Sequence, residues 1–422
     1  MNRSHTRTTP PNAHISKSRS LVNECHFSEE AVHENEVDFV VPFCHRNYFL
    51  NDLFGRHRAI LAELLVANSR LSFEKGERVK AQFWVDENVA LAHADLIEKI
   101  DRFCSEYAKT IESVSAVQIV PGGEAIKNDI HIQERMLKVF NAANLDRQSY
   151  VIVLGGGAVL DAVGFACTIA HRGLRLIRIP TTTLAQTDSA VGVKNGINLF
   201  QKKNWLGAFG VPFAVFNDRQ LLTTLSHDDF ISGFSEAVKV ALLKSPTDFR
   251  ELQQNAKEIA RRNPDAYWPL IVRSAEAHLA HITEGGDPFE MLEARPLDFG
   301  HWSAHKLEAM SNFTLSHGHA VAIGVALDTL YSQEVLGLSG DKVEAVLQTL
   351  TEIGFSLWHP LLEESGLLFE GLEEFRQHLG GRLTITLLKD IGKPVEVHEI
   401  DWQKMRRASE KLRGFATPYA PI

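Results

Sequence analysis

Residues 151–192 read VIVLGGGAVLDAVGFACTIAHRGLRLIRIPTTTLAQTDSAVG. The apolar run VIVL ends in three glycines, which precede a predicted helix, AVLDAVGFACTIA, and a second apolar run at 174–180. Glycines let the backbone turn sharply and approach a pyrophosphate, whose charge would lie on the free amides at the helix start. A triple glycine is often only a tight turn, but here PGGE at 121–124 ends the previous strand. The threonines after residue 180 add hydrogen-bond donors for phosphate and ribose, or they act only as helix caps. The stretch therefore predicts a dinucleotide-binding unit.

The alternation of short apolar runs and amphipathic segments continues on the amino-terminal side of this stretch. Strands are predicted at 37–43, 81–87 and 115–121, and helices at 60–69 and 92–107. This rhythm predicts an open, mostly parallel α/β sheet with helices on both faces.

After about Asp218 the chain changes character, because helical periodicity replaces strand-like runs. We expect a disordered tail at 1–30, a dinucleotide-binding α/β domain at 31–218 and a helical domain at 219–422. The tail is polar and basic and lacks the apolar stretch of a secretory signal, while its lack of acidic residues leaves an organelle transit peptide open.

Composition limits the partners of the chain. Its 422 residues carry 44 basic and 53 acidic side chains, a formal net charge of −9, which argues against nucleic acid but leaves small anionic substrates open. No window approaches 18 uninterrupted apolar residues, so no membrane span is expected. The four cysteines are irregularly spaced and form no CxxC pair, which favours a reducing cytoplasm.

Three segments of the helical part offer ligands for a divalent metal: Glu236 in GFSEAVK, His301 in DFGHWSAH and His317 in LSHGHAVAIG. One glutamate and two histidines leave an open position for substrate, as in catalytic zinc sites. His301 and His305 are four residues apart and share a helix face. Among 19 histidines such a spacing also arises by chance, so the histidines carry weight only together with their neighbouring segments.

The run at 155–209, together with GFSEAVK, FGHWSAHKLE and HGHAVAIG, resembles the 3-dehydroquinate synthase family of sugar phosphate cyclases. The match is co-linear over roughly residues 35–395. The resemblance implies an NAD-binding α/β domain, a helical domain with a divalent metal, Zn²⁺ or Co²⁺, an active site in the cleft between them, and a homodimer.

The family's functional positions are carried over one by one. Its metal ligands fall on Glu236, His301 and His317. Its catalytic and substrate-binding residues, including an aspartate beside the metal and an arginine that reaches the neighbouring subunit's phosphate site, fall on Asp188, Lys194, Asn204, Lys239, His305 and Arg172. Its cofactor contacts fall on Asp86, Glu124, Lys127, Gly156, Gly157, Asp161, Thr181, Thr182 and Lys203.

The resemblance also implies a reaction sequence. Reversible hydride transfer to NAD makes a ketone that acidifies the neighbouring C–H bond, and phosphate then leaves by elimination. NADH returns the hydride, the ring opens, and the enolate closes by an intramolecular aldol reaction. A metal helps because it polarises the hydroxyl being oxidised and stabilises the developing oxyanion.

Several positions depart from the 3-dehydroquinate synthase pattern. Those enzymes have an arginine four residues before an asparagine, whereas here Arg295 stands three residues before Asp298. No lysine occurs between Lys257 and Lys306, where those synthases place one against the substrate carboxylate, and His378 stands about where a later lysine would be. Asp298 would disfavour a carboxylate substrate and accept hydrogen bonds from hydroxyls, so we count Asp298 and His378 among the substrate-binding residues.

Aspartate and histidine at these places are similar to the valiolone-type cyclases, so we expect a small phosphorylated ketose, sedoheptulose 7-phosphate, as the substrate. His305 is retained as in 3-dehydroquinate synthases, which keeps that enzyme, acting on the acid phosphate of the shikimate pathway, as the alternative. Cyclisation of glucose 6-phosphate to 2-deoxy-scyllo-inosose is a third possibility that no residue favours. A metal-dependent polyol dehydrogenase would not need Lys194 or Arg172 for phosphate, and a scaffold paralogue would not need the metal ligands.

Overall fold

The computed structural model describes residues 35–37, 39–200, 202–285, 289, 297–378 and 382–415, except the side chains of Ser365 and His378. It falls into two compact units, Met1–Phe43 and Cys44–Ile422. The predicted tail at 1–30 lies outside the described residues.

The described part of the first unit, residues 35–37 and 39–43, contains neither helix nor strand. Phe39 and Val40 are 83% and 91% exposed. The strand predicted at 37–43 is therefore wrong. An apolar run becomes a strand only where a neighbouring strand can pair with its backbone, and none pairs with this one among the described residues.

The second unit contains a seven-stranded parallel sheet in the order β1-β9-β6-β5-β2-β3, with β4 also paired to β2. The strands are β1 (Asn47–Leu50), β2 (Val79–Asp86), β3 (Ile111–Ser113), β4 (Gln118–Val120), β5 (Tyr150–Gly155), β6 (Arg175–Pro180) and β9 (Ala214–Asp218). The strands predicted at 81–87 and 115–121, and both apolar runs of the 151–192 stretch, are confirmed.

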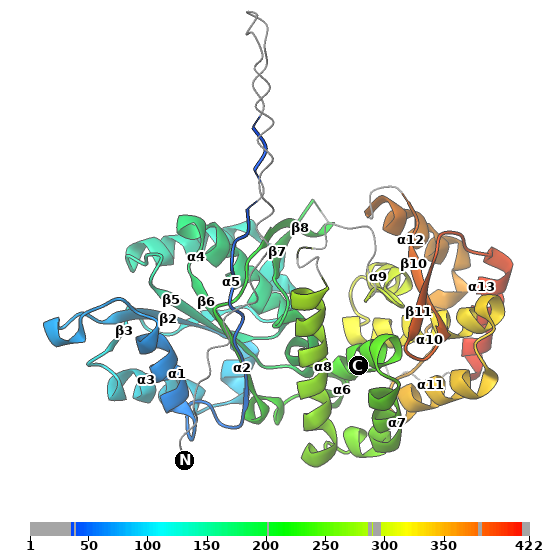
Figure 1. Cartoon of the computed structure of the whole chain (residues 1–422), viewed down its shortest axis with the longest axis horizontal. Coiled ribbons are helices and arrows are strands. Elements are labelled where there is room, and N and C mark those ends of the chain that lie inside the picture. Colours follow the sequence, from blue (N-terminus) through cyan, green and yellow to red (C-terminus); the bar gives the residue numbers. More distant parts are fainter. Residues whose placement is uncertain are drawn as a thin grey trace, which may run out of the picture. The chain divides into compact units, whose positions relative to one another are not determined.

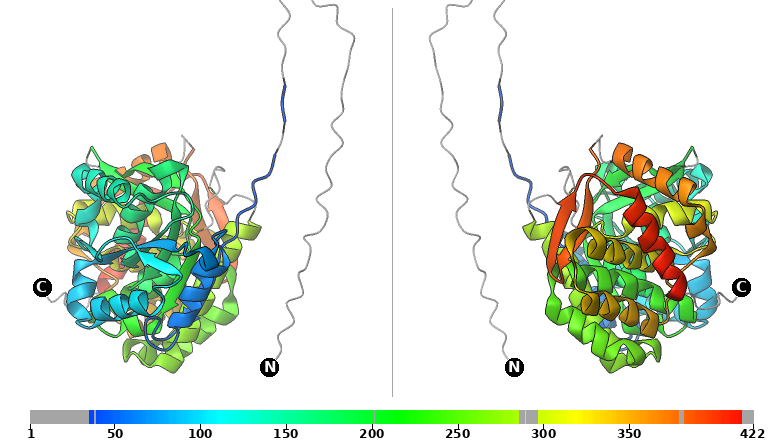
Figure 2. Two further views of the ribbon diagram at one scale, coloured as in Figure 1. Left: turned by 90° about the vertical axis from the view of Figure 1, so that its left-hand side faces the viewer. Right: turned by 90° about the vertical axis from the view of Figure 1, so that its right-hand side faces the viewer.

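Helices cover both faces of this sheet (Figure 2, left). They are α1 (Arg58–Ala67), α2 (Glu87–Ala92), α3 (Leu96–Glu106), α4 (Ile130–Ala142) and α5 (Gly157–Ile169). The period of two in β5 explains the layers, because Ile152 and Leu154 belong to the core cluster that α1 and α3 also line, whereas Val151 and Val153 pack with α4 and α5. The α/β prediction is confirmed.

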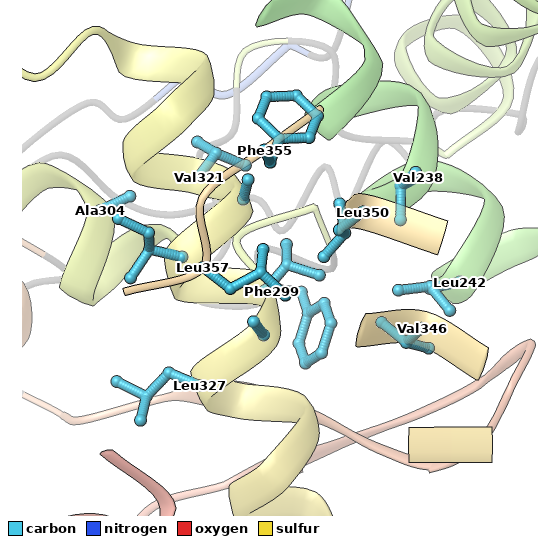
Figure 3. Close-up of a cluster of buried hydrophobic side chains, with 14 of the residues drawn as sticks. Val238, Leu242, Phe299, Ala304, Val321, Leu327, Val346, Leu350, Phe355 and Leu357 are labelled. Carbon is cyan, nitrogen blue, oxygen red and sulfur yellow. The ribbon is translucent and has the colours of Figure 1, made fainter. Parts of the chain in front are cut away.

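The carboxyl-terminal half is mainly helical (Figure 1). Its helices are α6 (His227–Lys244), α7 (Pro246–Ala260), α8 (Pro264–Glu284), α9 (His301–Met310), α10 (His317–Leu336), α11 (Gly340–Ile353), α12 (Ser365–His378) and α13 (Trp402–Leu412). The buried helix α10 packs against α6, α9, α11 and α13. Side chains from α6, α10 and α11 meet around Phe299 in the core of this half (Figure 3).

Two antiparallel hairpins were not expected from the sequence. The first, β7 (Lys194–Leu199) with β8 (Lys202–Phe209), lies between β6 and β9 in the chain, and the second, β10 (Ile385–Asp390) with β11 (Lys393–Val397), belongs to the helical half. In β10, Leu387 and Leu388 are both buried, so its run does not show the alternation of a half-buried strand. Among the described residues, no helix has the length and apolar character needed to cross a bilayer.

Candidate functional site

Three helices of the second half bring the predicted metal ligands together. Glu236 lies in the middle of α6 and is buried, while His301 and His317 are the first residues of α9 and α10. The Nε2 atoms of His301 and His317 lie 3.4 and 3.5 Å from Glu236 Oε1. Ligand atoms around a tetrahedral ion with bonds of 2.0–2.2 Å lie about 3.4 Å apart, so these spacings fit a divalent metal.

The buried Glu236 carboxylate also has the charge that a metal requires. Its Oε1 has no hydrogen-bond donor among the residues that the structure describes. Burial opposes ionisation, but Lys239, with Nζ 2.5 Å from Oε2, and the two histidines hold the pKa of Glu236 well below its usual range. An ionised, buried oxygen without a donor is a group that a cation would satisfy.

His317 is oriented by a glutamate that the sequence analysis did not single out. Glu308 Oε2 lies 3.0 Å from Nδ1 of His317, which turns Nε2 of that ring toward Glu236. Despite burial, Glu236 and Glu308 together raise the pKa of His317 to about 9 in the metal-free protein. Glu308 follows His305 by three residues on α9, so the run FGHWSAHKLE could have indicated it.

His305, Glu308 and His317 form a second group of metal-ligand type. In this group, however, Glu308 Oε1 already accepts a hydrogen bond from Lys203 at 2.9 Å. The ammonium would repel a second cation at this place. The arrangement therefore supports one metal position, at Glu236, His301 and His317, with Lys203 and Glu308 beside it.

The amino end of α9 is fixed by close packing on α10. Gly300 has φ +79°, and the backbone of Gly324 and Val325 passes next to its Cα. The buried Asp328 accepts hydrogen bonds from the Gly300 amide at 2.9 Å and from Trp302 Nε1 at 3.0 Å. These contacts hold His301 in register with His317, since α10 carries both Asp328 and His317.

Asp188 has a partner that the sequence gave no reason to expect. It lies in a π-helical turn, Ala185–Ser189, and its Oδ1 is 2.8 Å from Nδ1 of His278 on α8. Burial opposes ionisation of Asp188, but the nearby His278 lowers its pKa below the usual value. The negative charge of Glu236 opposes this effect and the positive charge of Lys239 supports it, so Asp188 belongs to the electrostatic surroundings of the metal position.

We expect His278→Gln to lower the rate of a reaction that uses Asp188 about 10- to 100-fold, because the substitution loosens the Asp188 carboxylate and misplaced groups cost rate steeply. Steady-state kinetics and zinc content measured together are the test. Glu276→Gln, at an exposed position of α8, is the matched control and should behave as wild type. A loss of bound zinc in His278→Gln, or kinetics equal to those of the control, would contradict this role.

The glycine turn lies at the carboxyl end of β5, as predicted, and α5 begins at Gly157. Among Gly155, Gly156 and Gly157 none has a positive φ, so the turn does not need glycine for its backbone angles. The reason is close approach instead. A Cβ on Gly157 would lie 2.7 Å from Ser189 Oγ.

A cavity of about 180 Å³ connects this turn with the metal position. It is lined by Gly156, Gly157 and Thr182 from the α/β half and by Asp229, Ser316 and His317 from the helical half. The free amides at the start of α5 and the strand-end position suit the phosphates of a dinucleotide. A cofactor in this cavity would therefore lie beside the metal.

The other predicted cofactor residues surround this turn or form a second group. Asp86 caps α2 through the Asn88 amide, and its side chain lies beside Gly122. Thr181 is buried, while Thr182 accepts a hydrogen bond from the Ala185 amide, so it is a helix cap as well as a cavity residue.

A second group joins α5 to the β7–β8 hairpin. Lys127 donates hydrogen bonds to Asp161, at 3.0 Å, and to Asn204, while Glu124 accepts one from Asn198. Asn204, expected at the substrate phosphate, therefore contacts the cofactor residue Lys127 in this structure.

The remaining predicted residues are less closely assembled. Two of them belong to the metal cluster. Lys239 forms an ion pair with Glu236, and the ring centroid of His305 lies 5.4 Å from that of His301. Asp298 is half-buried before α9, and its charge raises the pKa of Lys239, although burial opposes this. Lys194 and Arg172 are both exposed. The side chain of His378 and the whole of Arg295 lie outside the described residues.

Comparison with known proteins gives consistent matches. Models of the 3-dehydroquinate synthase N-terminal and C-terminal domains match residues 117–232 and 233–374. A 3-dehydroquinate synthase of Rhodopseudomonas palustris (strain BisB18) is 36% identical over 305 residues, 69% of this chain and 78% of that protein.

Two solved structures share the fold. One is a 2-epi-5-epi-valiolone synthase from Streptomyces hygroscopicus subsp. jinggangensis 5008 with NAD⁺ and Zn²⁺ bound, with a TM-score of 0.77, 22% identity, and coverage of 90% of this chain and 99% of that one. The other is a 2-deoxy-scyllo-inosose synthase complexed with carbaglucose-6-phosphate, NAD⁺ and Co²⁺, with a TM-score of 0.69, 21% identity, and coverage of 86% and 96%. At these identities the likeness concerns the fold.

Proposed function

The chain belongs to the 3-dehydroquinate synthase family, and from this premise we propose that it is an NAD- and metal-dependent sugar phosphate cyclase. In this proposal it is a carbon–oxygen lyase that converts a C7 ketose phosphate, sedoheptulose 7-phosphate, to a carbocycle with loss of phosphate. The observation that carries the proposal is the cavity that reaches from the glycine turn to His317, beside a carboxylate–histidine cluster with metal-ligand spacing.

Glu236, His301 and His317 would hold a Zn²⁺ or Co²⁺ ion, which when bound polarises the substrate hydroxyl that is oxidised. Gly156, Gly157 and the cavity around them would hold NAD, which supplies the redox step. Asp188 is ionised and can accept a hydrogen bond from a substrate hydroxyl. Lys194 and Arg172 carry the cationic side chains that would bind a phosphate.

The choice of substrate rests on charge. Asp298 puts a carboxylate near Lys239, in addition to Asp188 and Glu236, which stand at positions that the 3-dehydroquinate synthases share. A substrate carboxylate would be repelled there, whereas the hydroxyls of a neutral ketose can donate to these groups. The second candidate, 3-dehydroquinate synthase, is favoured by His305 and by the name of the 36% identical relative.

Phosphate release from purified protein with NAD and zinc or cobalt tests the proposal, with sedoheptulose 7-phosphate and the shikimate-pathway acid phosphate offered in parallel and the product masses recorded. We expect release from the heptulose phosphate without net NADH. Release from the acid alone would make the chain a 3-dehydroquinate synthase, and net NADH from a simple polyol would indicate a dehydrogenase. We further propose that the chain forms a homodimer, which light scattering tests. We also propose that it is cytoplasmic, which cell fractionation tests.

Asp298→Asn is expected to lower kcat/KM for the heptulose phosphate about tenfold and to improve relative turnover of the acid phosphate, because one negative charge near Lys239 is removed. Competition between the two substrates measures this ratio. Asp341→Asn, at the exposed start of α11, is the control. Unchanged kinetics in Asp298→Asn would remove the charge argument for a neutral substrate.

A further inference from the structure

The chain from the end of β6 to the first residue of β7 carries two residues of the proposed reaction, Asp188 and Lys194. The π-helical turn Ala185–Ser189 ends immediately after Asp188. Carbonyl groups at the end of such a short helix lack donors within the helix, and buried carbonyls need a partner elsewhere. The position of both side chains therefore depends on what binds the carbonyl groups of residues 189–194.

A single buried side chain binds most of these carbonyl groups. Arg178 of β6 is fully buried, and the two N–H groups of its Nη1 are shared among the carbonyl oxygens of Ser189, Ala190 and Gly192 at 2.8–3.1 Å. Its Nη2 donates to the Lys194 carbonyl at 3.1 Å and to Asn195 Oδ1 at 2.6 Å. Every one of these acceptors is a neutral oxygen, so the guanidinium here organises backbone, and within the described part of the chain no carboxylate lies at ion-pair distance from it.

The two carbonyl groups that Arg178 does not reach have other partners. The Val191 carbonyl lies 3.0 Å from Nε2 of His45, and the Val193 carbonyl accepts the Gly210 amide at 2.7 Å. Burial lowers the pKa of His45 to about 4, so its ring is neutral at pH 7 and can donate from Nε2. All six carbonyl groups from residue 189 to residue 194 are thus satisfied.

We propose that Arg178 is a positioning residue that fixes Asp188 and Lys194 through the backbone between them. A guanidinium is suited to this task because it presents several N–H donors in one rigid plane, which an ammonium cannot do. Asp188 precedes the first bound carbonyl by one residue, and Lys194 carries the last. The backbone placement does not depend on the substrate, whereas its consequence for the rate rests on the proposed function.

Arg178→Lys is the test, because it keeps the charge and removes the fork of donors. We expect kcat for phosphate release to fall about 100-fold, as for other displacements of about 1 Å at a reacting centre. The NAD dissociation constant should change less than kcat, because the glycine turn is formed by β5 and α5 and approaches this segment at Ser189. Amide hydrogen exchange in a peptide covering 185–195 should become about tenfold faster.

Arg175→Lys is the matched control, in the same strand and with a similar set of hydrogen bonds. Arg175 donates to the Asn68 carbonyl at 3.0 Å, to Tyr150 Oη at 2.8 Å and to Gln148, at the opposite end of β6. We expect wild-type kcat and unchanged exchange at 185–195 in this variant. Equal effects of the two substitutions would show a general loss of stability and would overturn the proposal.

A second pair of measurements keeps the proposal testable if Arg178→Lys does not fold. His45→Ala removes only the donor to Val191, so we expect a smaller loss of kcat, about fivefold, with faster exchange at the same peptide. Unchanged exchange at 185–195 in whichever variant folds overturns the positioning role. If wild-type protein releases phosphate from neither substrate, the proposed function fails, while the exchange measurement still decides the role of Arg178.

Discussion

Glu236→Gln is expected to remove bound metal and to lower phosphate release about 1000-fold or more, the largest catalytic effect that this structure predicts. The substitution keeps the shape of the side chain but replaces the charged oxygen that faces His301 and His317 at 3.4 and 3.5 Å. A neutral amide offers a divalent ion one weak ligand and no charge. Only the two histidines would then remain as strong ligands, which is too few to retain the metal. Zinc content by mass spectrometry and phosphate release are measured on the same preparation.

Removal of the charge also leaves Lys239 buried beside an amide, which destabilises the fold by about 3–5 kcal/mol. Two further measurements separate this effect from loss of the metal. Chelation of wild-type holoenzyme should abolish activity, and zinc or cobalt should restore it, without any change of sequence. Glu334→Gln is the substitution control. Glu334 of α10 forms an ion pair with Lys411 of α13, so the same change of charge is made in an ion pair that does not involve the metal ligands. Full zinc content and activity in Glu236→Gln would refute the metal assignment.

Several parts of this site could be predicted from sequence because they lie at the end of an element, although Glu236 lies in the middle of α6. The triple glycine follows a strand, and His301 and His317 begin helices, so these motifs carried weight together with the co-linear resemblance to the family. The same reasoning failed at 37–43, where an apolar run has no strand beside it among the described residues. The pattern of apolar residues indicates which segments can form a strand or pack on a core. Whether a segment does so depends on a neighbouring strand or helix with which it can pair.

The residues that sequence reasoning missed act through partners far away in the chain. His278 meets Asp188 across 90 residues, and Arg178 binds carbonyl groups on a segment without regular periodicity. In the sequence of α10, Asp328 shows no feature that indicates a role. Its role follows only from the packing of the start of α9, where Gly300 and Trp302 donate hydrogen bonds to it. Such contacts depend on how elements are arranged in space, which the periodicity of one segment does not contain.

Gly300→Ala is expected to destabilise the protein by about 3–5 kcal/mol and to lower its zinc affinity. Two costs add. The left-handed backbone, φ +79°, costs a side-chain-bearing residue about 1–2 kcal/mol, and the new Cβ would lie 2.5 Å from Val325 N and 2.8 Å from Gly324 C. Because these atoms belong to the backbone of α10, the start of α9 must move, and His301 moves with it.

Gly337→Ala separates the two costs. Gly337 ends α10 with φ +72°, yet a Cβ there would meet no atom within 4 Å, so this variant has only the backbone strain of about 1–2 kcal/mol. Thermal unfolding of both holoenzymes should show the larger loss for Gly300→Ala, and zinc titration should weaken only there, because Gly337 lies a whole helix away from His317. Equal unfolding temperatures and equal zinc affinities would mean that α9 can shift without moving His301. The metal site would then not depend on the contact between Gly300 and α10, and the position of His301 would have to be set by the remainder of α9.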